Sequence, residues 1–330
     1  MGVLVTGANG FIGSNLVRKL LDEGNKVRCL VHKSDHRLKN LPVEIVWGSM
    51  LDDSVIKNAT DGVDLVYHLA GRATDWGSRG TFFRSNVDGT RKVARFCVEN
   101  GVKRLVFSSS LAVHRFSGHV DSDEETPADQ RKYAYGASKV GAEKIVDYIG
   151  RSTSLETVIV RPGVVVWGPE DTTAFVHMAP LLEHGRWGHV SGGRTLLCYS
   201  YIDNLVSGLI LAGFSEKARG NTFIITDDIK LTWKDLIAAT ISAFGARERT
   251  FSFPGIIARP VGVGMEMLWR FFGAKNPPPV TDYRTALVSK DFHFSCKKAK
   301  KLLGYEPMVD FEQGLTATID WWRKNRADGK

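Results

Sequence analysis

The sequence contains few cysteines, and none of them is spaced to hold a metal. Cys29, Cys97, Cys198 and Cys296 are the four cysteines of 330 residues. They lie too far apart in the chain for the short spacing of metal ligands, and three of them stand in apolar stretches. We therefore expect four reduced, structural thiols, as in a cytoplasmic protein, and no metal site.

Long apolar runs are also missing. No stretch reaches the roughly 20 residues that span a bilayer, and no cleavable signal peptide opens the chain, so we expect a cytoplasmic location. Lys and Arg outnumber Asp and Glu by 44 to 36, which gives a net charge of +8. This basic excess favours an anionic cofactor or an anionic lipid surface as a ligand. Because no nucleic-acid-binding motif accompanies it, we expect no nucleic-acid partner.

The first half of the chain alternates short apolar runs with helical stretches, which is typical of repeated strand-helix units. The predicted strands are Val3–Thr6, Val27–Val31, Glu44–Trp47, Leu65–His68, Leu105–Ser108 and Thr157–Arg161. Runs such as "LVYHLAG" are continuously apolar, as in parallel strands that are covered on both faces. The sequence predicts an α/β fold with a doubly wound parallel sheet.

The alternation weakens after about residue 165. We expect a dinucleotide-binding domain over residues 1–165 and a smaller α/β substrate lobe over residues 166–330, with some segments returning to the first domain. The segment 253–273 is apolar and interrupted by Pro260. Its charged residues, Arg259, Glu266 and Arg270, favour an amphipathic helix packed on the lobe, and peripheral contact with a membrane is the alternative.

Three glycines stand three apart in "VLVTGANGFIGSNL", between a predicted strand and a predicted helix. In such a turn the first glycine allows the sharp bend, the second lets the backbone approach a pyrophosphate, and the third lets helix and strand pack closely. The helix N-terminus then offers free N–H groups to the anion. The turn therefore predicts dinucleotide binding by Gly7, Asn9, Gly10, Phe11, Ile12 and Gly13.

The end of the second predicted strand distinguishes the two nicotinamide cofactors. An acidic residue there would bind the ribose hydroxyls of NAD, but the strand ends at Val31 and is followed by His32 and Lys33. Arg37 and Lys39 come shortly after, so a 2′-phosphate is favoured and we predict NADP(H), with His32 and Lys33 as contacts. NAD(H) is the alternative, since an exposed basic loop explains these residues about as well.

A second pattern carries chemistry. In "YAYGASK", Tyr135 and Lys139 are four apart and share one face of a helix. A nearby ammonium and the charged nicotinamide would lower the pKa of the tyrosine, which is otherwise a poor base. Upstream, "RLVFSSS" ends a strand with serines, whose hydroxyls are candidates to hold a substrate oxygen against Tyr135.

Together, "TGANGFIG", "HLAG", "SSS" and "YGASK", in this order, resemble an extended short-chain dehydrogenase/reductase, a family with a Rossmann-type fold. The resemblance covers residues 1 to about 325. It implies that Ser110, Tyr135 and Lys139 are catalytic: Tyr135 exchanges the proton, Lys139 binds the ribose, and Ser110 orients the substrate. It also implies cofactor contacts by Leu69, Ala70, Gly71, Pro162 and Val164, a structural Asn86, and a homodimer.

Two departures from the family pattern bear on the substrate. Where sugar-nucleotide members usually carry Asn and Arg, this chain has Val165 and Leu197, which disfavours a diphosphate ligand. Other stretches, such as "FSCKKAKKLLGYEP", resemble the 3β-hydroxysteroid dehydrogenase-like group. We predict a small hydrophobic substrate, of the 3β-hydroxysteroid or 3-oxo lipid type. Its pocket wall is expected from the bulky apolar residues Trp76, Trp167, Phe175, Trp187 and the segment 253–273, with an interlobe core as the other reading of each aromatic.

The predicted activity is therefore NAD(P)-dependent interconversion of a secondary alcohol and a ketone. Two alternatives stay open. One is a sugar-nucleotide epimerase or dehydratase, which would show no net redox change. The other is a non-catalytic NADP(H)-sensing protein, against which the intact Ser110, Tyr135 and Lys139 argue.

Overall fold

A seven-stranded parallel sheet forms the centre of the molecule. The computed structural model describes residues 1–327, and the strand order is β12-β7-β5-β4-β1-β2-β3, with every neighbouring pair parallel. The strands are β1 (Gly2–Thr6), β2 (Lys26–Val31), β3 (Glu44–Trp47), β4 (Leu65–His68), β5 (Arg104–Ser108), β7 (Glu156–Pro162) and β12 (Thr222–Ile225). The predicted doubly wound α/β fold is confirmed, and β12 brings a segment of the C-terminal half to the edge of this sheet.

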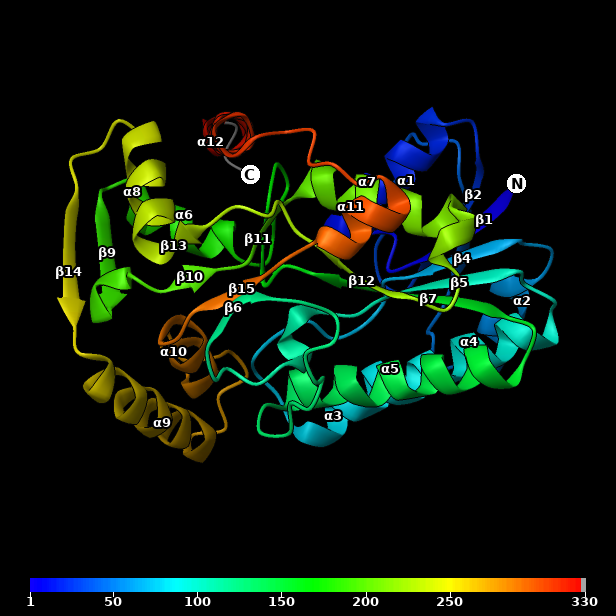
Figure 1. The fold of residues 1–330 in the computed structure, drawn as a ribbon, viewed down its shortest axis with the longest axis horizontal. Coiled ribbons are helices and arrows are strands. Elements are labelled where there is room, and N and C mark those ends of the chain that lie inside the picture. Colours follow the sequence, from blue (N-terminus) through cyan, green and yellow to red (C-terminus); the bar gives the residue numbers. More distant parts are fainter. Residues whose placement is uncertain (328–330) are drawn as a thin grey trace.

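Helices cover both faces of the sheet (Figure 1). One face carries α1 (Phe11–Asp22), α7 (Ile202–Phe214) and α11 (Lys297–Leu303); the other carries α2 (Asp53–Thr60), α3 (Arg79–Phe83), α4 (Gly89–Glu99) and α5 (Ala134–Ser152). The central strands β4 and β5 are buried along their whole length, which explains why they read as unbroken apolar runs. Both helix layers therefore shield the sheet, and the loops at its carboxyl edge remain to form a site.

The second lobe is built from short strands and helices. Its strand pairs are β8 (Val165–Trp167) with β11 (Tyr199–Tyr201), β9 (Arg186–Val190) with β14 (Arg249–Phe253), β10 (Leu196–Leu197) with β13 (Leu231–Thr232), and β6 (His119–Ser122) with β15 (Phe292–Phe294). Its helices are α6 (Phe175–Leu182), α8 (Trp233–Ala243), α9 (Gly255–Phe271), α10 (Asp282–Val288) and α12 (Phe311–Ala327). Two-stranded pairs have little stability of their own, so this lobe depends on packing between its elements.

One apolar core joins the two lobes. It extends from β1 and α1 through Trp167 and Phe175 to α8 and α12. Trp167 and Phe175 are fully buried and pack edge to face with ring centroids 5.0 Å apart. These two aromatics therefore belong to the core between the lobes, which is the alternative that the sequence favours for each aromatic taken singly, and they are not pocket residues. The four cysteines are buried and unpaired, as expected.

Helix α9 is amphipathic, but its apolar side faces solvent and its charged side faces the protein, which is the reverse of the prediction. Ala258 and Gly262 are its buried residues, whereas most of its large apolar side chains are exposed. Its charged residues make the contacts with the lobe, as described below. The prediction of an apolar face packed on the lobe is wrong. Among residues 1–327, no helix combines the length and apolarity that crossing a bilayer requires.

Candidate active site

The glycine turn lies between β1 and α1 and leaves no room for side chains. Gly7 has a φ of +71°, and a Cβ on it would lie 2.8 Å from the backbone nitrogen of Ala70. A Cβ on Gly13 would lie 2.2 Å from the Gly7 carbonyl oxygen, so the first turn of α1 packs directly on the bend. Gly10 precedes the helix and provides no side-chain cap, which leaves backbone N–H groups for an anion. This cradle fits a dinucleotide pyrophosphate.

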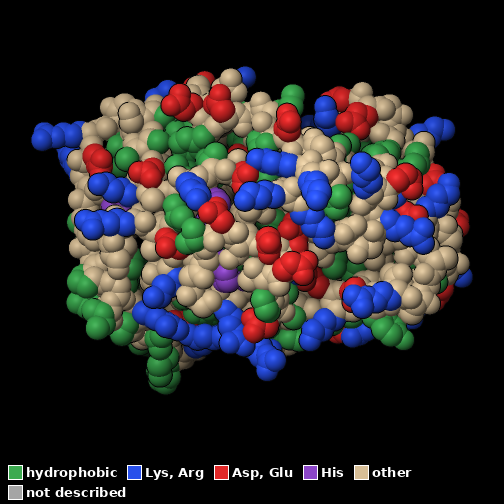
Figure 2. Space-filling model, viewed as in Figure 1, with side chains coloured by type: hydrophobic (Ala, Val, Ile, Leu, Met, Phe, Trp, Pro, Cys, Tyr) green, Lys and Arg blue, Asp and Glu red, His purple; other side chains and the backbone are tan. Residues whose placement is uncertain are grey.

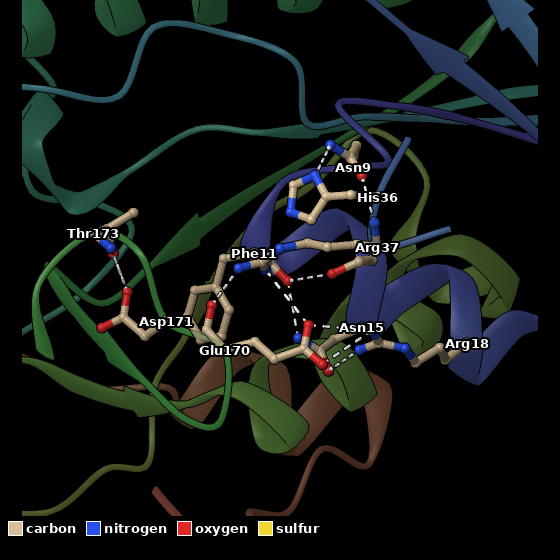
Figure 3. Close-up of polar contacts among 10 residues, drawn as sticks. Asn9, Phe11, Asn15, Arg18, His36, Arg37, Glu170, Asp171 and Thr173 are labelled. Atoms are coloured by element: carbon tan, nitrogen blue, oxygen red, sulfur yellow. Dashed lines mark hydrogen bonds and ion pairs between the residues drawn. The ribbon is translucent and has the colours of Figure 1, made fainter. Parts of the chain in front are cut away.

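The other residues predicted in this turn contribute in different ways. The Phe11 side chain is buried in the core, and Ile12 packs partly against it, so both can offer an anion only their backbone. Asn9 uses its side chain to hold the loop after β2: its Oδ1 accepts a hydrogen bond from the Arg37 backbone N–H at 3.0 Å, and its Nδ2 lies 3.2 Å from Nδ1 of His36. The glycine turn and the β2 loop are thus tied together (Figure 3).

The same loop is fixed from the other side by Glu170, in the segment between β8 and α6. Arg37 donates to the Glu170 carbonyl oxygen at 2.6 Å, and the Glu170 carboxylate pairs with Arg18 of α1 at 3.1 Å (Figure 3). His32 and Lys33, the predicted cofactor contacts, are exposed and make no ion pair within residues 1–327. The guanidinium of Arg37 is therefore engaged by the protein, and the charge on Lys33 is available to a ligand.

A buried hydrogen-bond chain supports the turn from below, and it was not predicted from the sequence. Thr6 Oγ1 lies 2.7 Å from Nδ1 of His68 and accepts from the backbone N–H of Ala70 at 3.1 Å. His68 Nε2 lies 3.0 Å from Oγ1 of Thr90. Burial lowers the pKa of His68 to about 3, so its ring is neutral. The chain fixes the segment of Leu69, Ala70 and Gly71 against the glycine turn.

A second unpredicted network surrounds Asn86. Its Oδ1 accepts from the Arg72 N–H at 2.7 Å, and its Nδ2 donates to the Arg72 carbonyl at 3.1 Å and to Ser138 Oγ at 2.8 Å. Ser138 in turn donates to the Tyr135 carbonyl at 2.7 Å. Every polar atom of the buried amide is used, in keeping with the structural role expected of Asn86. The network connects the segment after β4 to the first turn of α5.

The structure brings the three predicted catalytic residues together at the carboxyl end of β5. Ser110 is buried and caps a short helical turn, with its Oγ accepting from the Ala112 N–H at 3.1 Å. Its side chain also lies near enough to Tyr135 to lower the pKa of that phenol. The Lys139 ammonium is buried and donates to the Ser108 carbonyl at 2.8 Å. A Cβ on Gly71 would lie 3.6 Å from that ammonium, so the glycine-turn side and the triad meet here.

The electrostatics of the triad are set mainly by burial. Burial raises the pKa of Tyr135, and the Ser110 side chain opposes this shift. Burial also lowers the pKa of Lys139 to about 8, with Glu143 acting in the opposite direction. The expected lowering of the Tyr135 pKa concerns the protein with its charged nicotinamide bound, and it stays a prediction. Tyr135 is therefore a neutral phenol at neutral pH, with an ammonium one helical turn away.

Pro162 and Val164 lie where the chain leaves the sheet. Pro162 ends β7, where it pairs with Ile225 of β12. The next residue, Gly163, precedes Val164 and donates its backbone N–H to Ser200 Oγ at 3.2 Å. Val164 is half-buried and packs against the core. Val165 and Leu197, the positions that departed from the sugar-nucleotide pattern, are both buried apolar residues.

A cavity of about 350 Å³ opens beside Tyr135. It is lined by the aromatic rings of Tyr133, Tyr135 and Tyr283 and by charged residues, which are Asp75, Arg79, Lys132, Glu266, Arg270 and Asp282. Trp187 is not in this lining, and Trp76 lies behind it, buried, with Arg270 stacked on its ring at 4.5 Å. The predicted pocket wall is thus replaced by tyrosines and by charged residues of both signs.

A parallel sheet with a glycine turn opening its first helix, and polar residues gathered at its carboxyl edge, defines a dinucleotide-binding α/β protein of the Rossmann type. Comparison with known proteins narrows this class. Residues 3–219 match the family described as "NAD dependent epimerase/dehydratase family". The chain belongs to this family, and the prediction of an NAD(P)-dependent enzyme of the extended short-chain dehydrogenase/reductase type is confirmed.

Relatives extend the similarity over nearly the whole chain. A 2-alkyl-3-oxoalkanoate reductase of Stenotrophomonas maltophilia (strain K279a) is 30% identical, over 96% of this chain and 97% of the relative. A 3 beta-hydroxysteroid dehydrogenase/Delta 5-->4-isomerase of Mycobacterium tuberculosis (strain CDC 1551 / Oshkosh) is 31% identical, over 97% of this chain and 90% of the relative. The crystal structure of gox2253 superposes with a TM-score of 0.82 at 29% identity, covering 98% of both chains.

Proposed function

We propose that this protein reduces the ketone of a hydrophobic 3-oxo acid to a secondary alcohol, with NADPH as the hydride donor. The observation that carries the proposal is the pairing of a neutral, half-buried Tyr135 with a cavity whose lining includes the unpaired cations Arg79 and Arg270. The relatives named as 2-alkyl-3-oxoalkanoate reductase and 3 beta-hydroxysteroid dehydrogenase support a hydrophobic alcohol or ketone as substrate.

The cofactor would lie along the carboxyl edge of the sheet. Backbone N–H groups at the start of α1 would bind the pyrophosphate, and Gly7, Gly10 and Gly13 would let it approach. Leu69, Ala70 and Gly71 would pass near the ribose and phosphates, Lys139 would donate to the ribose hydroxyls, and Pro162 and Val164 would flank the nicotinamide. When bound, the reduced nicotinamide supplies a hydride to the substrate carbonyl carbon.

The proton comes from Tyr135. Because burial raises its pKa, the phenol is protonated at neutral pH, which is the form that can donate to a ketone oxygen. Ser110, whose side chain lies near Tyr135, would hold that oxygen in place. The phenolate left behind would be stabilised by the buried ammonium of Lys139, one turn along α5. This division of roles favours reduction over oxidation at neutral pH.

The charged wall of the cavity supports an acidic substrate. Arg79 and Arg270 line it, and neither makes an ion pair within residues 1–327. A guanidinium binds a carboxylate through two parallel hydrogen bonds, so either arginine could take the acid group of a 3-oxo acid. A neutral steroid would leave both without a partner. The buried Val165 and Leu197 provide none of the polar groups that sugar-nucleotide members use at these positions.

The loop after β2 supports NADP(H). Lys33 is exposed and unpaired among the described residues, and His32 precedes it, so both are available to a 2′-phosphate. No carboxylate follows the strand directly to bind a free ribose hydroxyl pair. NAD(H) is the alternative cofactor, and its use would leave Lys33 without a ligand contact.

Nicotinamide absorbance tests the proposal. Purified protein with NADPH is expected to oxidise the cofactor when a 2-alkyl-3-oxo acid is added, and less readily with a 3-oxosteroid. Tyr135→Phe removes the proton donor and is expected to lower kcat by about 10³-fold while leaving the Kd for NADPH near that of the parent protein. The matched control is Tyr148→Phe, an exposed tyrosine on the same helix, which should change neither value.

Two results would contradict the proposal. Conversion of a UDP-sugar without net oxidation of the cofactor would identify a sugar-nucleotide epimerase or dehydratase. Tight NADPH binding with no turnover of any of these substrates, and with the biological activity unchanged in Tyr135→Phe, would identify a cofactor-sensing protein.

A further inference from the structure

Helix α9 and strand β14 expose an apolar surface at one corner of the molecule. We define the α9 face as the exposed apolar residues of this region: Phe251, Phe253, Ile256, Ile257, Val261, Val263, Met267, Leu268, Phe271 and Phe272. Ile256 and Phe271 are each 83% exposed, and Phe272 is 72% exposed. A contiguous apolar surface of this kind marks a place where a protein meets a partner or a membrane, because water alone covers it at a cost in free energy.

The charged residues of α9 explain why its apolar residues face outward. Arg259 Nε pairs with Asp282 Oδ1 at 3.0 Å, and Glu266 Oε1 accepts from the Asp282 backbone N–H at 2.8 Å. Arg270 stacks on Trp76. These contacts attach the polar side of α9 to α10 and to the cavity wall. A rotation that buried the apolar face would break all of them, so the outward orientation is fixed by specific contacts.

Cations predominate beside the α9 face. The segments 75–79, 131–132 and 255–275 carry six Lys or Arg residues, all exposed: Arg79, Arg131, Lys132, Arg259, Arg270 and Lys275. Lys132 and Arg259 pair with Asp282 and Arg270 stacks on Trp76, whereas the other three make no ion pair among the described residues. The two carboxylates of these segments, Asp75 and Glu266, are half-buried and bonded to neighbouring residues. Figure 2 shows apolar side chains projecting at the lower left, where Figure 1 places α9, with Lys and Arg side chains beside them along the lower edge.

We propose that the α9 face docks the protein on an anionic lipid bilayer, with the apolar side chains entering the interface and the surrounding cations contacting lipid phosphates. Apolar residues bordered by Lys and Arg are the composition of interfacial helices that lie in a membrane surface. A second copy of this chain would bring the same unpaired cations, Arg79, Arg131 and Lys275, together, which disfavours self-association through this face. The helix lies on the bilayer and does not cross it.

The position of the face gives the docking a consequence. Glu266 and Arg270 of α9 line the cavity beside Tyr135, so the helix that docks also forms part of the cavity wall. An amphiphile with an acid group and long alkyl chains partitions into bilayers. Docking through α9 would therefore hold the cavity close to the surface from which such a molecule comes. This consequence rests on the proposed function, whereas the docking itself does not.

Co-sedimentation with vesicles tests the docking without reference to turnover. The full-length protein is mixed with phosphatidylcholine vesicles that do or do not contain phosphatidylglycerol. Binding is expected on the anionic vesicles at about 0.01 M salt, where charges act over roughly 30 Å, and should fall sharply at about 1 M salt. Phe271→Ser with Phe272→Ser should weaken binding at least tenfold, on the order expected for losing two inserted rings.

Two further variants separate the contributions. Lys275→Gln should weaken binding to anionic vesicles by about fivefold and leave the weak binding to pure phosphatidylcholine unchanged. Met308→Ser is the matched apolar control, because Met308 is 78% exposed but lies outside the α9 face. It should bind like the parent protein. Each variant is checked for an unchanged thermal midpoint, since all of these side chains are exposed.

Three outcomes would overturn the inference. The first is no sedimentation with anionic vesicles at low salt. The second is equal weakening by Met308→Ser and by the double phenylalanine variant. The third is a parent protein that is a dimer in solution, binds no vesicles, and becomes a monomer in the double variant, which would identify a second copy as the occupant. Loss of ketone reduction with vesicle binding intact would instead count against the proposed function alone.

Discussion

At the carboxyl edge of the sheet, polar side chains are buried and bonded to one another, whereas along α9 the charged side chains face the protein and the apolar ones face solvent. Thr6, His68 and Thr90 form an unbroken hydrogen-bond chain beneath the glycine turn. On α9, Arg259 and Glu266 attach the helix to α10, and Phe271 extends outward. The polar groups named here are bonded in both regions, but only the first region also covers its apolar groups.

The difference indicates two kinds of task. A site that positions a cofactor needs fixed atoms, and a closed hydrogen-bond network under a rigid sheet provides them. A surface that meets a partner needs apolar groups available in the free protein, and internal ion pairs can hold them in that orientation. Substitutions that have the same effect in both regions would contradict this difference. Substitutions whose effects have opposite sign would support it.

The largest contrast is expected from one substitution made in each region. Gly13→Ala would place a Cβ 2.2 Å from the Gly7 carbonyl oxygen and 2.9 Å from Ala8 Cα, and these backbone atoms cannot rotate away. We expect a loss of about 3 kcal/mol in the free energy of unfolding, and a fall of about 10²-fold in turnover as the cradle is displaced. Gly264→Ala on α9 meets no atom within 4 Å and should stabilise the helix by about 1 kcal/mol.

Denaturant unfolding and cofactor titration of both variants check this contrast. A Gly13→Ala protein that bound NADPH and turned over like the parent would show that the glycine turn is not the pyrophosphate cradle. Destabilisation by Gly264→Ala would show that the exposed side of α9 is packed against something in solution, since the helical propensity of alanine alone predicts the opposite sign.

The two regions also differ in how far the sequence predicts them. The predicted strands Glu44–Trp47 and Leu65–His68 match β3 and β4 residue for residue. For β4 the reason is that a strand covered on both faces has a continuous apolar signal with sharp ends. The glycine spacing and the pair of Tyr135 and Lys139 are likewise local patterns, because their residues are only three and four apart in the chain. Thr6 and His68 were not identified as partners, since their contact depends on two strands 62 residues apart being neighbours.

For the second lobe, local patterns were misleading. The spacing of Arg259, Glu266 and Arg270 shows that α9 is amphipathic, but it does not say which side faces the protein. That choice depends on Asp282, whose position is known only once α10 packs on α9. Trp167 and Phe175 failed as pocket residues for a similar reason: burial between the lobes and exposure in a cavity give the same apolar sequence.

The next prediction is that the buried ammonium of Lys139 sets the alkaline limit of activity. Burial lowers the pKa of Lys139 to about 8, so its ammonium is present below that pH and lost above it. Because the ammonium stabilises the phenolate of Tyr135, kcat/KM should be flat below pH 8 and fall about tenfold per pH unit above it. The pH profile of NADPH oxidation at saturating cofactor measures this.

The matched variants are Lys139→Met and Lys144→Met, on the same helix. The first should lose most activity at every pH, and the second, which removes an exposed lysine, should keep the parent profile. A parent profile that stays level well above pH 9 would show that the charge on Lys139 is dispensable. It would also remove the main electrostatic distinction between the buried carboxyl edge of the sheet and the exposed α9 region.

The smallest expected effect concerns the choice of cofactor in the loop after β2. Arg37 is engaged by Glu170, so Lys33 is the cation we expect at the 2′-phosphate. An exposed ion pair contributes at most about 1 kcal/mol, so Lys33→Gln should raise the KM for NADPH by about fivefold and leave that for NADH unchanged. Lys39→Gln, which removes another exposed lysine of the same loop, should change neither value.

Equal effects of the two substitutions on both cofactors would mean that the loop attracts dinucleotides only through its general charge. An unchanged ratio of the two KM values in both variants would instead leave the loop as an exposed basic segment without a ligand, and would favour NAD(H) as the cofactor.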